Sequence, residues 1–110
     1  HPIQPSEALG MANYEKYYHT MFYLVLRLFG YDIQVEVLTH TGRIDAVISL
    51  QGYVYVVEFK LGDAESALAQ IKTKAYHAQY LGTSRKVILI GIGFDVAMRN
   101  VGSFLVEEVN

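Results

Sequence analysis

The sequence contains no cysteine, which excludes disulfide bridges and metal sites built from thiolates. It also lacks an apolar run of the length that a membrane-spanning helix needs. The longest candidate, from Met21 to Phe29, is too short and is interrupted by Arg27. No signal peptide is recognisable, so we expect a cytoplasmic setting and no membrane partner.

Positive charge is not in excess, since nine Lys and Arg residues against eleven Asp and Glu residues give a net charge of −2. This composition does not predict the broad basic field typical of nucleic-acid-binding domains. The chain is 52% hydrophobic and has nine tyrosines among its 110 residues, which indicates one packed domain. We expect residues 13–110 to form that domain and residues 1–12 to be a leading segment or linker.

The most informative stretch is a predicted β-hairpin over residues 42–60. Two runs rich in β-branched and aromatic residues flank Gln51-Gly52, and a two-residue loop ending in glycine is typical of a tight turn. Such a loop sets Asp45 opposite Glu58. Directly opposed residues have Cβ atoms about 4.5–5.5 Å apart, so two opposed carboxylates repel each other, and a divalent cation between them would reverse that repulsion. The register therefore predicts an oxygen-ligated metal site.

Ordinary ion pairing is the alternative interpretation of the same charges. Diagonal pairs of Asp45 with Lys60 and of Arg43 with Glu58 would make a solvated salt-bridge patch, and spacing alone leaves both interpretations open. The other face of the hairpin is expected to be wholly apolar and to face the core. Its members are Ile44, Ala46, Ile48, Leu50, Tyr53, Tyr55, Val57 and Phe59.

Two helices are predicted on either side of the hairpin in the chain. Apolar residues recur at helical spacing from Tyr14 to Phe29, nearly all round the helix, so we expect it to be largely buried and to end at Gly30. A second helix is predicted from Ala64 to about Leu81, with Asp63 as its N-cap.

Three further strands are predicted at residues 33–38, 86–94 and, with a weaker pattern, 103–108. The strand–helix–strand order makes the strand at 86–94 parallel to the strand of Glu58. Gly91 and Gly93 lie inside that strand, where they favour close backbone packing over a phosphate-binding loop.

This order of elements, with Asp45 on one strand and Glu58-Phe59-Lys60 on the next, resembles the PD-(D/E)XK nuclease superfamily over about residues 14–94. The resemblance implies an α/β, restriction-endonuclease-like fold with an αβββαβ core and a mixed central sheet flanked by helices. Four stretches are similar to a bacterial and archaeal subfamily in which the domain follows an ATPase-like region. They are Gly-Arg-Ile-Asp-Ala-Val-Ile, Glu-Phe-Lys-Leu, Ala-Leu-Ala-Gln-Ile-Lys-x-Lys-x-Tyr and Ile-Gly-Ile-Gly-Phe-Asp.

The resemblance also implies a metal site and its ligands. Asp45 and Glu58, together with the backbone carbonyl of Phe59, match the ligands of Mg²⁺ or Mn²⁺ in the superfamily. Glu15 matches the acid that active members carry on the first helix, as a further ligand and catalytic residue. An acid in a first turn also interacts favourably with the helix dipole, and that explanation of Glu15 stays open.

Catalytic roles follow from the same resemblance. Lys60 matches the lysine that orients or helps to deprotonate the attacking water, and Gln70 matches a polar residue of the second helix near the site. Tyr76 is a looser match and is expected to pack. Ile44 stands where the motif has proline, a position that does not contact the metal. The implied activity is metal-dependent hydrolysis of DNA, with RNA as an alternative substrate and a homodimer for cutting both strands.

Two other functions stay open. The acidic net charge favours a nuclease-fold module that binds nucleic acid or a protein without chemistry. A purely structural domain could instead dimerise through an exposed helix or the edge at residues 103–108. The histidines predict no competing site, because they show neither metal-ligand spacing nor a triad pattern: His1, His19, His40 and His77.

Overall fold

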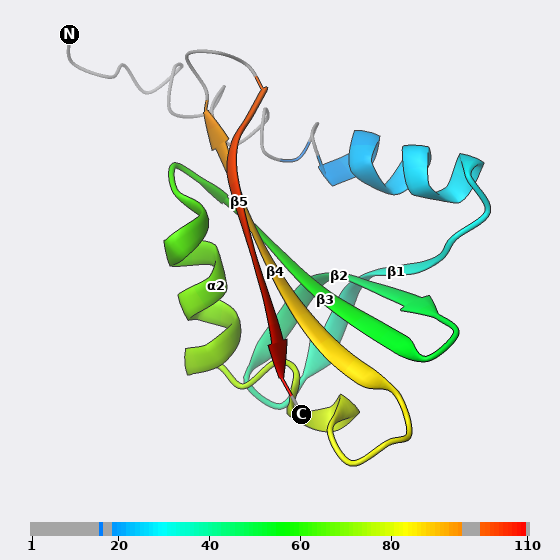
Figure 1. The fold of residues 1–110 in the computed structure, drawn as a ribbon. Helices are drawn as coiled ribbons and strands as arrows, with labels where there is room; N and C mark the ends of the chain where they lie inside the picture. The colour runs from blue at the N-terminus through cyan, green and yellow to red at the C-terminus, as the bar shows by residue number, and fades with distance from the viewer. Residues whose placement is uncertain (1–15, 17–18, 96–99, 110) are drawn as a thin grey trace, which may run out of the picture.

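A five-stranded sheet runs through the middle of the computed structural model, which describes residues 16, 19–95 and 100–109 (Figure 1). Its strands lie in chain order, and all neighbours are antiparallel except the parallel pair β3–β4. The expected leading segment, residues 1–12, lies outside the described residues. The elements are β1 (Asp32–Thr39), β2 (Gly42–Leu50), β3 (Tyr53–Leu61), α2 (Ala64–Thr73), a 3-10 helix (Ala78–Tyr80), β4 (Lys86–Asp95) and β5 (Asn100–Val109).

Helices cover both faces of the sheet, which confirms the α/β fold with a mixed central sheet. On one face α2 packs on the middle strands, and on the other lies the helix at residues 19–28 (Figure 1). The parallel pairing of β3 with β4 agrees with the right-handed crossover expected from the sequence. Within the described part of the chain, none of the helices has the length and apolar character needed to cross a membrane.

The helix at residues 19–28 ends where the sequence predicts. Gly30 has a φ of 86°, and its N–H donates to the Arg27 carbonyl while the Tyr31 N–H donates to the Leu26 carbonyl. These two bonds make a Schellman motif, which needs a residue that tolerates positive φ. The predicted start of this helix lies outside the described residues.

Burial of this helix is smaller than predicted. Phe22, Tyr23 and Leu26 pack against the sheet, whereas Leu28 and Phe29 are 86% and 76% exposed. A helix lying on one sheet buries only the stripe that faces it. The apolar residues on the outer side of the helix therefore remain exposed.

The second helix, α2, is shorter than predicted, because it ends at Thr73 and not near Leu81. Ala75 follows with a φ of 52°, and the Tyr76 N–H donates to the Ile71 carbonyl at 3.1 Å. This is again a Schellman ending, here on an alanine, and Ile71 and Tyr76 pack together in the core beside it. Tertiary packing therefore stops a helix that the apolar spacing would continue.

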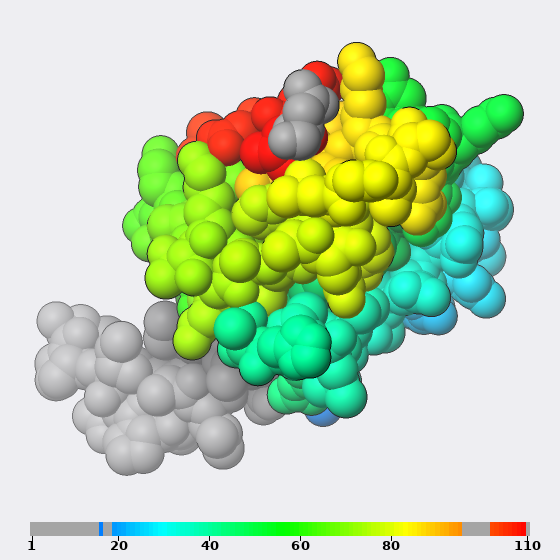
Figure 2. All heavy atoms as spheres, turned by 90° about the horizontal axis from the view of Figure 1, so that it is seen from below, coloured from blue at the N-terminus to red at the C-terminus, as the bar shows by residue number. Residues whose placement is uncertain are grey.

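The segment that follows α2 is also held in place by contacts with the start of β2. Figure 2 shows the yellow-green residues that follow α2 lying against the teal residues at the start of β2. There the Thr41 hydroxyl donates to the Lys74 carbonyl at 2.6 Å. A Cβ on Gly42 would lie 2.7 Å from the Tyr76 hydroxyl oxygen, so glycine leaves room for that ring.

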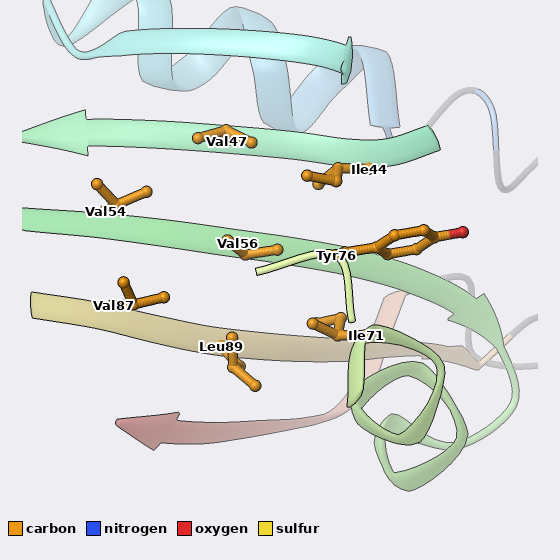
Figure 3. Close-up of a cluster of buried hydrophobic side chains, with 8 residues drawn as sticks. All are labelled: Ile44, Val47, Val54, Val56, Ile71, Tyr76, Val87 and Leu89. Carbon is orange, nitrogen blue, oxygen red and sulfur yellow. The ribbon is translucent and has the colours of Figure 1, made fainter. Parts of the chain in front are cut away.

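Two buried clusters occupy the two faces of the sheet. The cluster beneath α2 is drawn in Figure 3 and contains Ile44, Val47, Val54, Val56, Ile71, Tyr76, Val87 and Leu89. The cluster beneath the other helix contains Ile33, Ala46, Ile48, Val57, Phe59, Ile92 and Phe94. Both faces of the hairpin are therefore core, and the prediction that Ile44 shares a face with Ala46 is wrong.

A local break in β1 and β2 explains the position of Ile44. Alternate residues of a regular strand share a face, so Ile44 and Ala46 can separate only if the alternation fails between them. The β1–β2 ladder omits the pair of Glu36 and Asp45 while keeping its register on both sides. Glu36 has a φ of 52°, a conformation that L residues rarely adopt. Asp45 thus sits at an irregularity in its strand.

Candidate active site

Glu58 is a buried carboxylate on the α2 side of β3. Only 2% of the residue is exposed, and the Gln70 amide donates from Nε2 to Glu58 Oε2 at 3.2 Å. Burial of a charged group is costly unless hydrogen bonds compensate for the lost water, and the α2 amide supplies such a bond. Lys60 is half-buried, two residues further along β3, so strand alternation places it on the same face.

Asp45 lies where β2 and β3 stop pairing. The predicted register is present from Leu50↔Tyr53 to Ala46↔Val57, and the next pair, Asp45 and Glu58, does not belong to the ladder. The Asp45 side chain takes the place of the missing ladder bond, because the Phe59 N–H donates to Asp45 Oδ2 at 2.8 Å. This bond holds the Asp45 carboxylate beside Phe59, the residue between Glu58 and Lys60 in the chain.

His19 is a neighbour of Asp45 that the sequence patterns did not reveal. Its Nε2 lies 3.5 Å from Asp45 Oδ2, and its ring packs on the Phe59 ring with centroids 4.1 Å apart. These residues line a pocket of about 130 Å³, together with Lys16, Thr20, Phe22, Tyr23, Val35, Glu36 and Ala46. The only sequence signal was the position of His19, one helical turn after Glu15.

The two carboxylates therefore meet different partners. Glu58 contacts Gln70 of α2, whereas Asp45 contacts His19 of the opposite layer, and both acids adjoin the backbone of Phe59. Among the residues that the structure describes, no three His, Asp or Glu side chains gather as a metal-binding group. Glu15, the remaining predicted acid, lies outside them.

Other predicted residues separate into packing and ion-pair roles. Tyr76 is 4% exposed within the cluster beneath α2, which agrees with its expected packing role. Arg43, expected as a diagonal partner of Glu58 under the salt-bridge interpretation, lies with Nη1 3.6 Å from Glu36 Oε2 on β1. Both partners of that pair are more than 60% exposed, so the pair contributes little to stability.

The start of α2 packs closely on β4. Asp63 accepts a hydrogen bond from the Ser66 N–H at 2.6 Å, as the predicted N-cap should. That backbone bond lowers the pKa of the Asp63 carboxyl. Added Cβ atoms on Gly91 and Gly93 would lie 2.5–2.7 Å from backbone atoms of residues 62–68. The two glycines therefore let α2 approach β4 and bring Gln70 to Glu58, as their predicted packing role requires.

Comparisons with known proteins show which family this chain is similar to. A family model described as the PD-(D/E)XK nuclease superfamily matches residues 13–104. An uncharacterised protein encoded in the vnfD 5′ region of Azotobacter chroococcum mcd 1 is 37% identical over 102 residues, which cover 90% of this chain. The chain spans about a fifth (20%) of the length of that relative. No solved structure matches the chain.

Proposed function

Because the chain belongs to the PD-(D/E)XK nuclease superfamily, we propose that it is a metal-dependent phosphodiesterase domain that hydrolyses DNA. Asp45 and Glu58, with the Phe59 carbonyl and Glu15, are the proposed ligands of Mg²⁺ or Mn²⁺. The observation that carries the proposal is the bond from the Phe59 N–H to Asp45, which holds one acid beside the Glu58-Phe59-Lys60 stretch that supplies the other acid and the amine.

The chemistry of the donor set fits such an ion. Carboxylate and carbonyl oxygens are the ligands that Mg²⁺ and Mn²⁺ prefer. The Phe59 N–H and the Gln70 amide each hold one of the acids by a hydrogen bond, as the outer partners of metal-bound carboxylates do. Such an ion would lower the pKa of a water molecule bound to it and would place positive charge beside the reacting phosphate.

The chain's own residues have distinct roles in this proposal. Asp45 and Glu58 provide negative charge that binds the ion. Gln70 orients Glu58 from α2, and the α2 N-terminal turn is seated on β4 by glycines. Lys60, on the same face as Glu58, would orient the attacking water as an ammonium or, as a neutral amine, would accept the proton of that water.

The proposal is tested by a cleavage assay with metal removal. The purified 110-residue chain is incubated with duplex DNA, single-stranded DNA and RNA in Mg²⁺ or Mn²⁺. We expect cleavage of DNA that EDTA abolishes, and at least about a 100-fold loss in Asp45→Asn. Asp32→Asn, an exposed aspartate at the start of β1, serves as the control and should cut normally. If wild-type protein cuts no nucleic acid with either metal, the proposal fails for this chain.

A module that binds nucleic acid or a protein without cleavage is the second candidate, favoured by the net charge of −2. Such a module does not need a metal ion at Asp45, so absence of Mn²⁺ binding would support it. We also propose that an ATPase-like region precedes the domain, with residues 1–12 as the linker. The domain would form a homodimer to cut both strands and would act in the cytoplasm.

A further inference from the structure

His19 is a partly exposed residue whose imidazole nitrogen Nε2 is a buried polar atom that the proposed function leaves unused. Its Nε2 makes no hydrogen bond within the described part of the chain, although Asp45 Oδ2 lies 3.5 Å away. N–H···O hydrogen bonds span about 2.7–3.2 Å, so this gap is too long for one. A buried imidazole nitrogen aimed at a carboxylate, but not bonded to it, calls for a further partner.

The distance between His19 Nε2 and Asp45 Oδ2 is close to that between two ligands of one metal ion. Bonds from a transition-metal ion to imidazole nitrogen or carboxylate oxygen are about 2.0–2.2 Å long. Two such ligands stand about 3.4 Å apart at a tetrahedral angle and about 3.0 Å apart at a right angle. The Nε2–Oδ2 distance of 3.5 Å is close to the tetrahedral value and about 0.5 Å longer than the right-angle value of an octahedral Mn²⁺ site, so the two side chains must approach slightly when Mn²⁺ binds.

Both groups are already held in place. The Phe59 N–H donates to the same Asp45 oxygen, and the His19 ring packs on the Phe59 ring. The His19 and Asp45 side chains are 25% and 23% exposed, so an ion can enter the pocket and keep some of its water. Lys16 and Glu36 line the same pocket with opposite charges, which offset each other.

We propose that His19 supplies an imidazole nitrogen to the metal ion that Asp45 binds. This inference rests on the proposed function, which makes Asp45 a metal ligand. It changes the expected chemistry of the site, because imidazole favours transition-metal ions whereas a set of oxygen ligands alone suits Mg²⁺. The site should therefore bind Mn²⁺ more tightly than Mg²⁺, and His19 should be the reason.

Titration calorimetry and pulsed electron paramagnetic resonance with Mn²⁺ test the inference without an activity assay. We expect wild-type protein to bind Mn²⁺ and to show modulation from an imidazole ¹⁴N nucleus. His19→Ala should lose that modulation and bind Mn²⁺ at least about tenfold more weakly, with a smaller change for Mg²⁺. His40→Ala, in the exposed turn between β1 and β2, is the matched control and should change neither readout.

The outcomes separate this inference from the proposed function. Mn²⁺ binding that Asp45→Asn abolishes but His19→Ala leaves intact would overturn the role of His19 and keep the metal site. Wild-type protein that binds no Mn²⁺ would overturn both. If His19→Ala does not fold, the wild-type spectrum decides alone, since bound Mn²⁺ without ¹⁴N modulation rules out the imidazole ligand.

Discussion

Replacing Lys60 with alanine is expected to lower the rate of DNA cleavage by about 10³-fold, within the range of about 10²–10⁴ for a positioned proton-transfer group. The side chain is half-buried at the end of β3 and belongs to neither core cluster. Its loss should therefore change the free energy of unfolding by less than about 1 kcal/mol. Single-turnover cleavage and urea unfolding measure the two effects.

A matched variant separates the role of Lys60 from a general loss of positive charge. Lys86→Ala removes an exposed lysine from β4 at the opposite end of the sheet, where it pairs in register with Tyr53. That variant should cut at nearly the wild-type rate. Mn²⁺ affinity should be unchanged in both, because the ammonium is not a ligand. Wild-type cleavage by Lys60→Ala would remove lysine from the mechanism.

Replacing Gly91 with alanine is expected to destabilise the fold by about 2–3 kcal/mol, the upper part of the typical range for overpacking. The added Cβ would lie 2.6 Å from the Ala64 carbonyl oxygen and 2.7 Å from the Leu68 backbone nitrogen. Neither atom can rotate away, so α2 must lift from β4. Gln70 would then move from Glu58, and metal affinity should fall together with stability.

Two comparisons keep this expectation specific. In Gly82→Ala the new Cβ meets open space, and the cost comes only from a φ of 81°, about 1 kcal/mol. Adding Leu68→Ala to Gly91→Ala should rescue nothing, because the closest obstacles are backbone atoms. Urea unfolding followed by circular dichroism gives all these values. A Gly91→Ala protein as stable as wild type would show that α2 is not seated as described.

The sequence predicted the sheet well where a local signal and the global fold agree. Gln51-Gly52 set the hairpin register, and Gly52 has the expected positive φ of 81°. Gly30 ends its helix in the same way. In each case glycine supplies a conformation that other residues resist, so one residue type identifies the turn.

Three features escaped prediction because tertiary contacts decide them. Ala75 adopts positive φ after α2, and no residue type marks that ending. The irregularity at Glu36 and Asp45 moves Ile44 to the other face, although the sequence alternates regularly through it. His19 meets Asp45 only because a helix remote in sequence packs on β3. Spacing along one strand cannot reveal a partner in another layer.

The sequence predicted which strands carry the candidate site, but not how its two carboxylates are placed. The acids and the amine lie on the neighbouring strands β2 and β3 as expected, but the carboxylates do not face each other in the ladder. Strand pairing ends one residue early, and the Asp45 side chain bonds to the Phe59 N–H there. The roles of Asp45, Glu58, Lys60, Gln70 and Glu15 stay predictions.

A crystal structure of the chain grown with Mn²⁺ tests the metal site most directly. Anomalous scattering at the manganese edge locates the ion independently of any refined ligand positions. We predict one peak about 2.0–2.3 Å from a carboxylate oxygen of Asp45 and of Glu58. Saturating Mn²⁺ with no peak there, or with the ion bound away from both acids, would contradict the account.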